Sequence, residues 1–326
     1  KTYLRSQTEF QDFDFEGSGM SVLLDILALN THYMAYYTNM VGNEMFLDTA
    51  QVRDSIVSHA KLMNYVPGSS QGSLAKVNIK VTPSNVEDNT STYLTLNKYT
   101  RFLGKDKGGI NYPFVNLYSN TVSKTDGTFN FSNVAIKQGE VITLQFLVDP
   151  TNDTRRFEIP SANVDTETIV ISVQESSSNT DTTIYNLYED ITEANSNSSI
   201  YFIEENEKQT YTLYFGDDVI GKRPKDGNIV ICTYLDNTGS ISNNISKFVV
   251  SQDIGGFKDN VIVSSVSGSY GGIDKETIEQ VRFRAPYYYS TQNRAVTKND
   301  YETLILKNYN NIDSVSVWGG EENDPV

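Results

Sequence analysis

The chain has 326 residues, a length that suggests about two domains, or three if one of them is small. Its 26 Lys and Arg residues stand against 41 Asp and Glu residues, and the resulting net charge of −15 disfavours both nucleic acid and an anionic membrane surface as partners. A single cysteine, Cys232, excludes an internal disulfide framework and a zinc site built from several thiolates. With 38% hydrophobic and 11% aromatic residues, the composition is that of a folded, acidic protein.

Neither end of the chain carries a recognisable targeting signal. The sequence begins at Lys1 rather than Met and ends at Val326, so we expect a fragment of a longer protein. No apolar run approaches the ~20 residues that a membrane span needs, because Asp25 interrupts the richest one, Val22 to Leu29. We therefore expect no membrane-spanning segment in this sequence.

The first part of the chain carries a helical pattern. Apolar residues at mixed spacings of three and four predict one long amphipathic helix from about Ser18 to Phe46. A second predicted helix runs from Thr49 to Asn64 and ends before Pro67-Gly68. We expect the two helices to pair as a helical hairpin arm over residues 1–66.

The middle of the chain changes to a period of two. From about Ser73 to Val250, apolar and polar residues alternate, which predicts an antiparallel β-rich middle domain over residues 67–252. The Asn- and Ser-rich stretch from Glu175 to Ser199 predicts a long loop or a paired hairpin, because apolar residues interrupt it.

The last part, residues 253–326, predicts a small α+β module that is truncated at the end of the sequence. A strand from Val261 to Val266 is followed by a flexible glycine-rich entry, Gly268 to Gly272. Asp274 is expected to cap a short helix that Pro286 terminates.

A second helix and a strand complete this module. Thr297 with Asp300 three residues later predicts a capping box at the start of the helix, and Ser314 to Val317 predicts a strand. The predicted fold class is therefore α+β and multidomain.

The sequence contains few residues that could act in catalysis. His32 and His59 are expected on a helix surface or in the hairpin interface, and Cys232 lies in an apolar strand as a buried structural thiol. Adjacent acids on a strand point to opposite faces, and Gly216-Asp217-Asp218 has the composition of a turn. The same argument applies to the remaining acidic pairs, Glu204-Glu205 and Glu321-Glu322. We expect no catalytic residue, no metal site and no cofactor, and hence not an enzyme.

The tyrosine clusters say more about function than the candidate catalytic groups do. Tyr33, Tyr36 and Tyr37 lie on the first predicted helix, partly off its leucine stripe, and the run Tyr287 to Tyr289 follows the Asp274 helix. A helix that is apolar over more than one face has to be covered by something beyond a hairpin partner. The cover is either the core of this chain or another protein, since tyrosine is enriched at protein interfaces.

Three ordered stretches carry a more specific pattern. The stretch from Gly271 to Glu302 combines a GG-x-D-x-E helix, a proline at Pro286 and the sequence R-A-V-T-x-x-D-Y. The other two are Tyr214 to Gly227, with its F-G-D turn, and Phe157 to Thr166. Together they resemble the baseplate J-like family, the wedge proteins of contractile phage tails and related injection machines. The opening Phe13 to Ser18 and its helices resemble the larger wedge subunit of the myophage branch in particular.

This resemblance covers the chain from about Glu9 to Trp318, with Asp218 at a position where the family often has glycine. It implies a structural subunit of a tail baseplate wedge. Copies would pair with each other, join other wedge proteins through a helical core bundle, and link neighbouring wedges into a ring around the tail hub. That ring reorganises to trigger sheath contraction. The implied location is the tail baseplate of the virion, after assembly in the host cytoplasm.

The resemblance also implies which residues make these contacts. The two N-terminal helices would supply the core bundle through Leu23, Leu24, Leu27, Met34, Tyr37, Val52, Ile56, Val57 and Met63. The C-terminal module would supply the ring contacts through Arg282, Tyr287, Tyr288, Arg294 and Tyr301.

A virion-surface adhesin or depolymerase that binds glycans is the alternative function. The Tyr-, Asn- and Thr-rich β composition suggests it. The two capped helices around Asp274 and Thr297 favour the wedge subunit, because an adhesin has no evident need for them.

Overall fold

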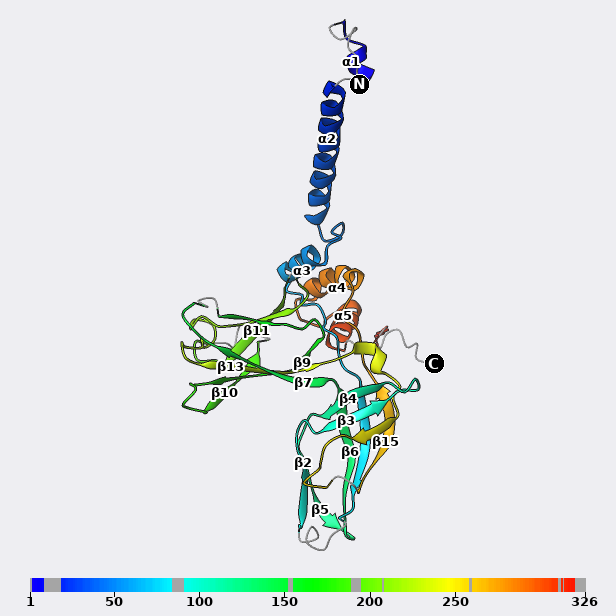
Figure 1. Ribbon diagram of the computed structural model, residues 1–326, viewed down its shortest axis with the longest axis vertical. Coiled ribbons are helices and arrows are strands. Elements are labelled where there is room, and N and C mark those ends of the chain that lie inside the picture. The colour runs from blue at the N-terminus through cyan, green and yellow to red at the C-terminus, as the bar shows by residue number, and fades with distance from the viewer. Residues whose placement is uncertain are drawn as a thin grey trace.

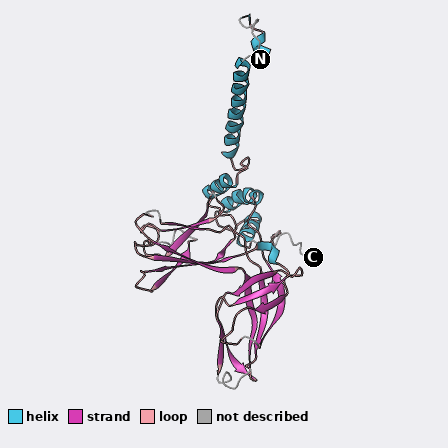
Figure 2. Cartoon of the chain, viewed as in Figure 1, coloured by secondary structure: helices cyan, strands magenta, loops and turns pink. Residues whose placement is uncertain are grey.

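The computed structural model describes residues 2–8, 19–83, 91–151, 155–188, 195–206, 208–257, 260–309, 312 and 314–319. A long helix, residues 19–44, projects from a small helical head formed by the helices at residues 53–62, 278–291 and 298–308. Below this head, two β-sheets extend in different directions (Figures 1 and 2). The helices are α1 (Thr2–Arg5), α2 (Gly19–Glu44), α3 (Arg53–Leu62), α4 (Ile278–Thr291) and α5 (Lys298–Asn308). This confirms the α+β class, with helices at the N-terminus, a β-rich middle and small C-terminal helices.

The first sheet has the strand order β14-β3-β4-β6-β1-β15, with β2 and β5 attached beside β6. Alternate side chains of β1 are buried, as the period of two predicts. Its strands are β1 (Leu74–Val81), β2 (Tyr93–Leu96), β3 (Arg101–Lys105), β4 (Asn111–Asn116), β5 (Asn120–Thr125), β6 (Thr128–Gln138), β14 (Lys247–Val250) and β15 (Val261–Tyr270).

The second sheet has the order β7-β13-β9-β10-β11-β12-β8 and its own apolar core. All of its strands lie between β6 and β14 in the sequence, so this sheet is inserted into the first one. Its strands are β7 (Glu140–Leu147), β8 (Arg156–Ile159), β9 (Val164–Gln174), β10 (Thr182–Leu187), β11 (Ile200–Glu205), β12 (Tyr211–Phe215) and β13 (Ile229–Asp236).

Strand β15 completes the first sheet from the far end of the chain. It pairs antiparallel with β1, from Val81 opposite Val261 to Leu74 opposite Tyr270. Residues 261–270 therefore belong structurally to the sheet, although the sequence pattern groups them with the C-terminal module. The β9–β10 pair is antiparallel, which shows that the stretch after Glu175 contains a paired hairpin rather than only a loop. Residues 189–194 of that stretch lie outside the described residues.

The expected helical hairpin does not form. α2 points away from the molecule, whereas α3 packs against α4 from the other end of the sequence (Figure 1). The cluster that holds the head together includes Ile56 and Ala60 of α3 with Val281 and Ala285 of α4. The apolar stripe of α3 is therefore covered by α4, whereas no helix or strand among the described residues packs along α2.

Helix α4 differs from its predicted bounds at both ends. Thr277, not Asp274, caps it, in a capping box with Gln280, and the Asp274 carboxylate accepts hydrogen bonds from Ser240. Pro286 lies inside the helix rather than ending it. The proline is on the exposed side of the helix. Gln292, in the left-handed conformation with φ of 47°, ends the helix.

Three further expectations concern the same region. The capping box of Thr297 with Asp300 at the start of α5 is confirmed. The predicted strand at residues 314–317 is absent from the described residues 314–319, where the Val317 amide donates to Glu302 instead. The stretch Gly268–Gly272 is not a flexible entry. Ser269 is buried and bonded to Ser242, and a Cβ added at Gly272 would lie 2.6 Å from the Gly239 carbonyl oxygen.

Candidate assembly interface

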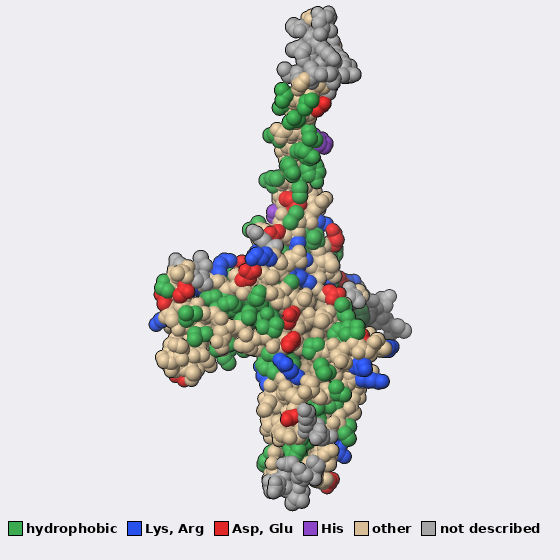
Figure 3. All heavy atoms as spheres, in the orientation of Figure 1, with side chains coloured by type: hydrophobic (Ala, Val, Ile, Leu, Met, Phe, Trp, Pro, Cys, Tyr) green, Lys and Arg blue, Asp and Glu red, His purple; other side chains and the backbone are tan. Residues whose placement is uncertain are grey.

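The α2 helix exposes an unusual amount of apolar surface. Leu27, Met34 and Val41 are 60%, 62% and 63% exposed, and apolar side chains gather along the face of the projecting rod that Figure 3 shows. Large helices in proteins gain most of their stability from packing an apolar face, and each Leu or Met side chain gains about 1.5–3 kcal/mol on full burial. Within the described residues, no helix is long and apolar enough to span a bilayer. The exposed apolar surface of the rod makes it a candidate protein interface.

The apolar side chains of α2 follow two seams. In each seam, successive residues are spaced alternately by four and three, the spacing that brings side chains onto one line of a helix in a coiled coil. The first seam is Leu23, Leu27, Asn30, Met34, Tyr37 and Val41. The second seam is Val22, Ile26, Leu29, Tyr33, Tyr36 and Met40.

The remaining side of α2 holds mostly small residues and a polar stripe. Asp25, His32 and Asn39 recur every seven residues and lie opposite the first seam. With about 100° of rotation per residue, the centres of the two seams are about 100° apart around the axis. Two seams at this angle fit a helix that contacts two other helices, as in a bundle of three or four. The seven-residue repeat was available in the sequence, and it identifies Asn30 and the second seam, which the predicted contact residues omit.

The predicted bundle residues fall into two groups. On α2, Leu23, Leu27, Met34 and Tyr37 are exposed on the first seam, and Leu24 beside them is half-buried. After α2, Val52 is exposed, whereas Met63 packs against the head cluster.

The predicted partner contacts of Ile56 and Val57 are wrong. Ile56 is completely buried against α4, and Val57 is buried at the head, so neither is open to a partner in this structure. The stripe of α3 is satisfied within the chain. The prediction of a partner interface stays open for the named residues of α2, for Val52 and for the half-buried Met63.

The base of α2 is attached to the head by backbone and side-chain hydrogen bonds. The Glu44 carboxylate accepts from the amides of Gln51 and Val52, at 2.8 and 3.2 Å, and these bonds hold its pKa below the ordinary value. The His59 ring nitrogen Nε2 lies 2.9 Å from the Glu44 carbonyl oxygen. These contacts fix the direction in which the rod leaves the head.

Arg282, a predicted ring-contact residue, belongs to the same attachment. Its guanidinium donates to the carbonyl oxygens of Leu47 and Ala50, at 3.1 and 2.6 Å, and pairs with Glu279. The side chain therefore bonds within the chain, between α4 and the segment that follows α2. This is a structural role that the sequence pattern did not indicate.

A buried charge cluster joins the head to the second sheet. Arg53 of α3 donates to both carboxylate oxygens of Glu205 on β11, at 2.7 and 3.2 Å, and Lys275 lies 3.0 Å from the same carboxylate. Burial opposes ionisation of Glu205, but the hydrogen bond from Arg53 and the charge of Lys275 outweigh it, so its pKa is below the ordinary value.

Glu276 is the second centre of this cluster. Its carboxylate accepts from the Tyr65 hydroxyl, at 2.8 and 3.0 Å, from the Gly68 amide and from Arg284. Arg53 also donates to the Glu276 carbonyl oxygen at 2.6 Å. Connected ion pairs and hydrogen bonds thus hold together the head, the segment that follows α3 and the second sheet.

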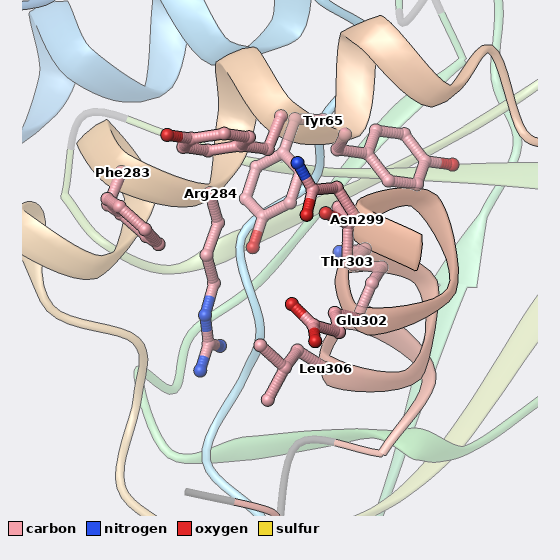
Figure 4. Close-up of a pocket in the computed structure, with 10 residues that line it drawn as sticks. Tyr65, Phe283, Arg284, Asn299, Glu302, Thr303 and Leu306 are labelled. Atoms are coloured by element: carbon pink, nitrogen blue, oxygen red, sulfur yellow. The ribbon is translucent and has the colours of Figure 1, made fainter. Parts of the chain in front are cut away.

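A pocket of about 240 Å³ lies between α4 and α5 (Figure 4). Tyr287 and Tyr288 line it, and Tyr288 packs edge-on against Tyr65 with ring centroids 5.6 Å apart. Lys307 donates to the Val66 carbonyl and lies 4.3 Å from the centre of the Tyr65 ring. Burial lowers the pKa of Lys307 to about 8.

The other predicted ring-contact residues, Tyr287, Arg294 and Tyr301, are exposed on the surface. Tyr287, which lies within α4 rather than after it, is exposed beside Phe283, with ring centroids 5.0 Å apart. Tyr301 is exposed on α5, and Arg294 is exposed and donates to Gln292. The structure thus brings Tyr287 and Tyr288 together at the pocket, and the contact of this set with a partner stays a prediction.

The candidate catalytic groups occupy structural positions. Glu204 faces Lys61 and Arg156, while Glu205 points to the opposite face of β11, into the charge cluster. Cys232 is buried, and burial raises the pKa of its thiol to about 12.

The remaining acidic candidates are Asp217, Asp218, Glu321 and Glu322. Asp217 accepts from the amides of Val219 and Ile220, and Asp218 has a φ of 68°, a conformation that glycine adopts more readily than other residues. Glu321 and Glu322 lie outside the described residues. Among the described residues, no group of three or more His, Cys, Asp or Glu side chains is arranged to hold a metal ion.

Comparison with known proteins defines the class of protein that this arrangement resembles. Residues 1–65 match the family model described as baseplate wedge protein gp6-like, helical domain. Residues 297–326 match the model of the baseplate structural protein gp6, C-terminal domain I. Both ends of the chain are therefore similar to structural proteins of a tail baseplate.

A particular relative agrees with these matches. The baseplate wedge protein gp6 of Enterobacteria phage T4 is 26% identical over 337 residues, which cover 95% of this chain and 49% of the relative. The chain thus spans about half the length of the curated relative that it matches.

A solved structure gives a weaker likeness. A chain in the cryo-EM structure of the anti-feeding prophage baseplate has a TM-score of 0.31 and 14% identity, over 97% of this chain and 62% of that chain. This value is too low to carry a conclusion about the present chain.

These matches carry a different family name from the one that the sequence motifs indicated, but they support the same kind of protein, a baseplate wedge subunit. The sequence motifs pointed to the baseplate J-like family, whereas the matches are to gp6-like wedge proteins, which carry a different family name. The similarity to a baseplate wedge subunit is supported, and the N-terminal match falls on the segment that resembles the larger wedge subunit.

Proposed function

We propose that this chain is a structural wedge subunit of a phage tail baseplate and that α2 is its attachment to other wedge polypeptides. The observation that carries the proposal is the exposed α2 rod with its two apolar seams. The similarity of residues 1–65 to the helical domain of gp6-like wedge proteins supports it. The proposed location is accordingly the tail baseplate of the virion.

The finer part of the proposal concerns assembly. Copies of the chain pair with each other and join other wedge proteins through a helical bundle that contains α2. The exposed aromatic residues around the α4–α5 pocket supply contacts between neighbouring wedges in a ring around the tail hub. The ring rearranges when the sheath contracts, and the ion pairs that join the head to the second sheet let each subunit move as a unit.

The role is mechanical, and no chemical step is part of it. The matched relatives carry structural names, which supports a protein that is not an enzyme. The glycan-binding alternative rests on the Tyr-, Asn- and Thr-rich composition of the sheets, and binding of the purified protein to a glycan array would support it over the wedge assignment.

A charge on the first seam tests the proposal. Leu27→Asp in the full protein places a carboxylate where partner helices meet, and we expect loss of incorporation into tail particles when the variant is supplied to a phage that lacks the protein. Asn39→Asp, on the polar stripe of the same helix, is the matched control and should assemble normally. Circular dichroism should show that both variants keep their β-sheets. Normal particles with Leu27→Asp would contradict the proposal.

A further inference from the structure

We infer that α5 is a hinged latch on the head and that the buried charge of Lys307 keeps this latch close to release. The hinge is the turn between α4 and α5, residues 292–297. When α5 detaches, α3, α4 and the second sheet stay together, because other contacts hold them. The inference concerns a motion within one chain and goes beyond the proposed role in a wedge.

The turn that joins α4 to α5 has little packing of its own. Every residue from 292 to 299 is exposed. Gln292 and Asn293 have φ angles of 47° and 57°, the left-handed conformation in which helices commonly end. The match to the C-terminal domain of gp6 begins at residue 297, directly after this turn. The turn is therefore a place where α5 can move without disturbing the helix before it.

Helix α5 is also the least packed helix of the head. None of its side chains is fully buried, and none belongs to the apolar cluster that holds α3 and α4 together. The pocket of about 240 Å³ between α4 and α5, lined by Tyr288 and Leu306 among others, leaves part of the facing surfaces without contact (Figure 4). Elements with few buried apolar contacts open locally at a low cost in free energy. We therefore expect α5 to open before α3 or α4.

Lys307 differs from the other buried cations of the head. Arg53 and Arg284 each pair with a carboxylate, at 2.7 and 3.0 Å. Within the described residues, Lys307 has no ion pair: its ammonium donates to the Val66 carbonyl and lies 4.3 Å from the centre of the Tyr65 ring. A carbonyl and a ring restore only part of the hydration that a charge loses on burial. The docked helix therefore carries a cost that disappears when α5 detaches and the ammonium returns to water.

The charges around Lys307 do not remove this cost. Burial lowers the pKa of Lys307 from 10.5 to about 8, the attraction of Glu276 does not outweigh it, and Arg284 adds to it. Burial raises the pKa values of the adjacent Tyr65 and Tyr211, so both rings stay neutral at pH 7 to 9. The other charged groups that line the two cavities beside Lys307 are Glu302 on α5, Lys61 on α3, Glu167 on β9, and Glu204 and Glu205 on β11.

Alkaline solution should tighten the latch. In the detached helix Lys307 is in water and keeps its ordinary pKa of 10.5, whereas in the docked helix it loses its proton near pH 8. The detached state thus binds more protons between these two values, so docking becomes more favourable as the pH rises through this range. At neutral pH the ammonium is charged, and α5 is held least tightly.

Detachment of α5 opens the pocket that it shares with α4 and uncovers the edge-on pair of Tyr65 and Tyr288. The second sheet does not follow this motion, because Arg53 and Lys275 bind it to the head through Glu205. The chain thus has a firm connection on one side of the head and a joint on the other.

Lys307→Met in the full chain tests the sign of the effect. The substitution keeps the length of the side chain and removes the charge, so we expect amide hydrogen exchange within residues 298–308 to become slower by at least about tenfold at pH 7. If Lys307 instead anchored α5, the loss of its bond to Val66 would make exchange faster. Lys298→Met, an exposed position on the same helix, is the matched control and should leave exchange nearly unchanged. Faster or unchanged exchange in Lys307→Met would overturn the inference.

The dependence on pH provides a second test. Between pH 7 and pH 9, protection of residues 298–308 in the wild-type chain, corrected for intrinsic exchange, should rise about tenfold. The rise should vanish in Lys307→Met, which has no proton to lose, and in Lys307→Arg, which stays charged at both pH values. Protection of α4, residues 278–291, should not change with it. No rise in the wild-type chain, or an equal rise in α4, would contradict a local latch controlled by Lys307.

These measurements use the purified chain alone, so their failure would leave the wedge assignment as it stands. The assembly of particles with Leu27→Asp tests that assignment separately. A chain in which α5 never opens independently of α4 would remove the latch and nothing else.

Discussion

The α2 rod and helix α3 of the head both carry apolar residues at helical spacing, but these residues are exposed on α2 and buried on α3. Leu27 on the rod is 60% exposed, whereas Ile56 in the head is completely buried against α4. The stripe of α3 is narrow enough for one neighbour to cover, and that neighbour comes from residues 278–291. The apolar surface of α2 extends over two seams, which a single hairpin partner cannot cover. The width of an apolar stripe thus indicates how many neighbours a helix needs.

The largest expected effect separates these two helices by stability. Ile56→Ala removes a fully buried side chain from the head, and we expect the free energy of unfolding to fall by about 2–5 kcal/mol. Leu27→Ala on the rod removes an exposed side chain and should change the stability of the isolated chain by less than about 0.5 kcal/mol. Urea denaturation at a concentration where the chain is monomeric measures both. Equal losses would show that the rod packs against its own chain in solution.

Local signals in the sequence were sufficient for several elements. The capping box of Thr297 with Asp300 acts within one turn of helix, so its residues identify it without knowledge of the rest of the fold. The period of two in β1 likewise follows from its own side chains. The turn at Asp217 depends on bonds to amides two and three residues away.

Long-range features could not be predicted in this way. A period of 3.6 residues shows which side of α3 is apolar, but not that α4 covers it from more than 200 positions further along the chain. The same limit applies to β15, whose pairing with β1 closes the first sheet around an inserted second sheet. Pro286 is a helix breaker by its chemistry, yet its position on the exposed side of α4 lets the helix continue.

Loss of the Arg53 side chain should weaken the attachment of the head to the second sheet. Arg53→Ala removes the guanidinium that binds the Glu205 carboxylate and the Glu276 carbonyl, and we expect a loss of about 1.5–3 kcal/mol, because Lys275 still faces Glu205. Limited proteolysis should detect faster cleavage near the head. Lys61→Ala, which removes a more exposed pair with Glu204, is the matched control and should have a smaller effect. A larger effect of Lys61→Ala would contradict the assignment of Arg53 as the main link.

Acid should weaken the same link. The pKa of Glu205 is lowered in the folded chain, so its contribution to stability is present above the ordinary value of 4.5 and is lost as pH falls through the lower folded value. We expect the wild-type chain to lose more stability than Glu205→Gln between pH 7 and pH 3. Unfolding curves at the two pH values measure the difference. The same loss in both proteins would assign the acid sensitivity to other carboxylates.

The smallest effect concerns α5, which differs from the rest of the head because none of its side chains is fully buried. A helix with so little packing depends more strongly on its caps, so Thr297→Ala should destabilise it by about 1 kcal/mol. Thr297→Ser keeps the hydroxyl that accepts from the Asp300 amide and should restore most of this loss. Amide hydrogen exchange within residues 298–308 measures the effect without requiring the whole chain to unfold. Unchanged exchange in Thr297→Ala would mean that contacts around the α4–α5 pocket, rather than the cap, hold α5 in place. Helix α5 would then resemble α3. Helix α2 would remain as the helix without support from its own chain in the described structure.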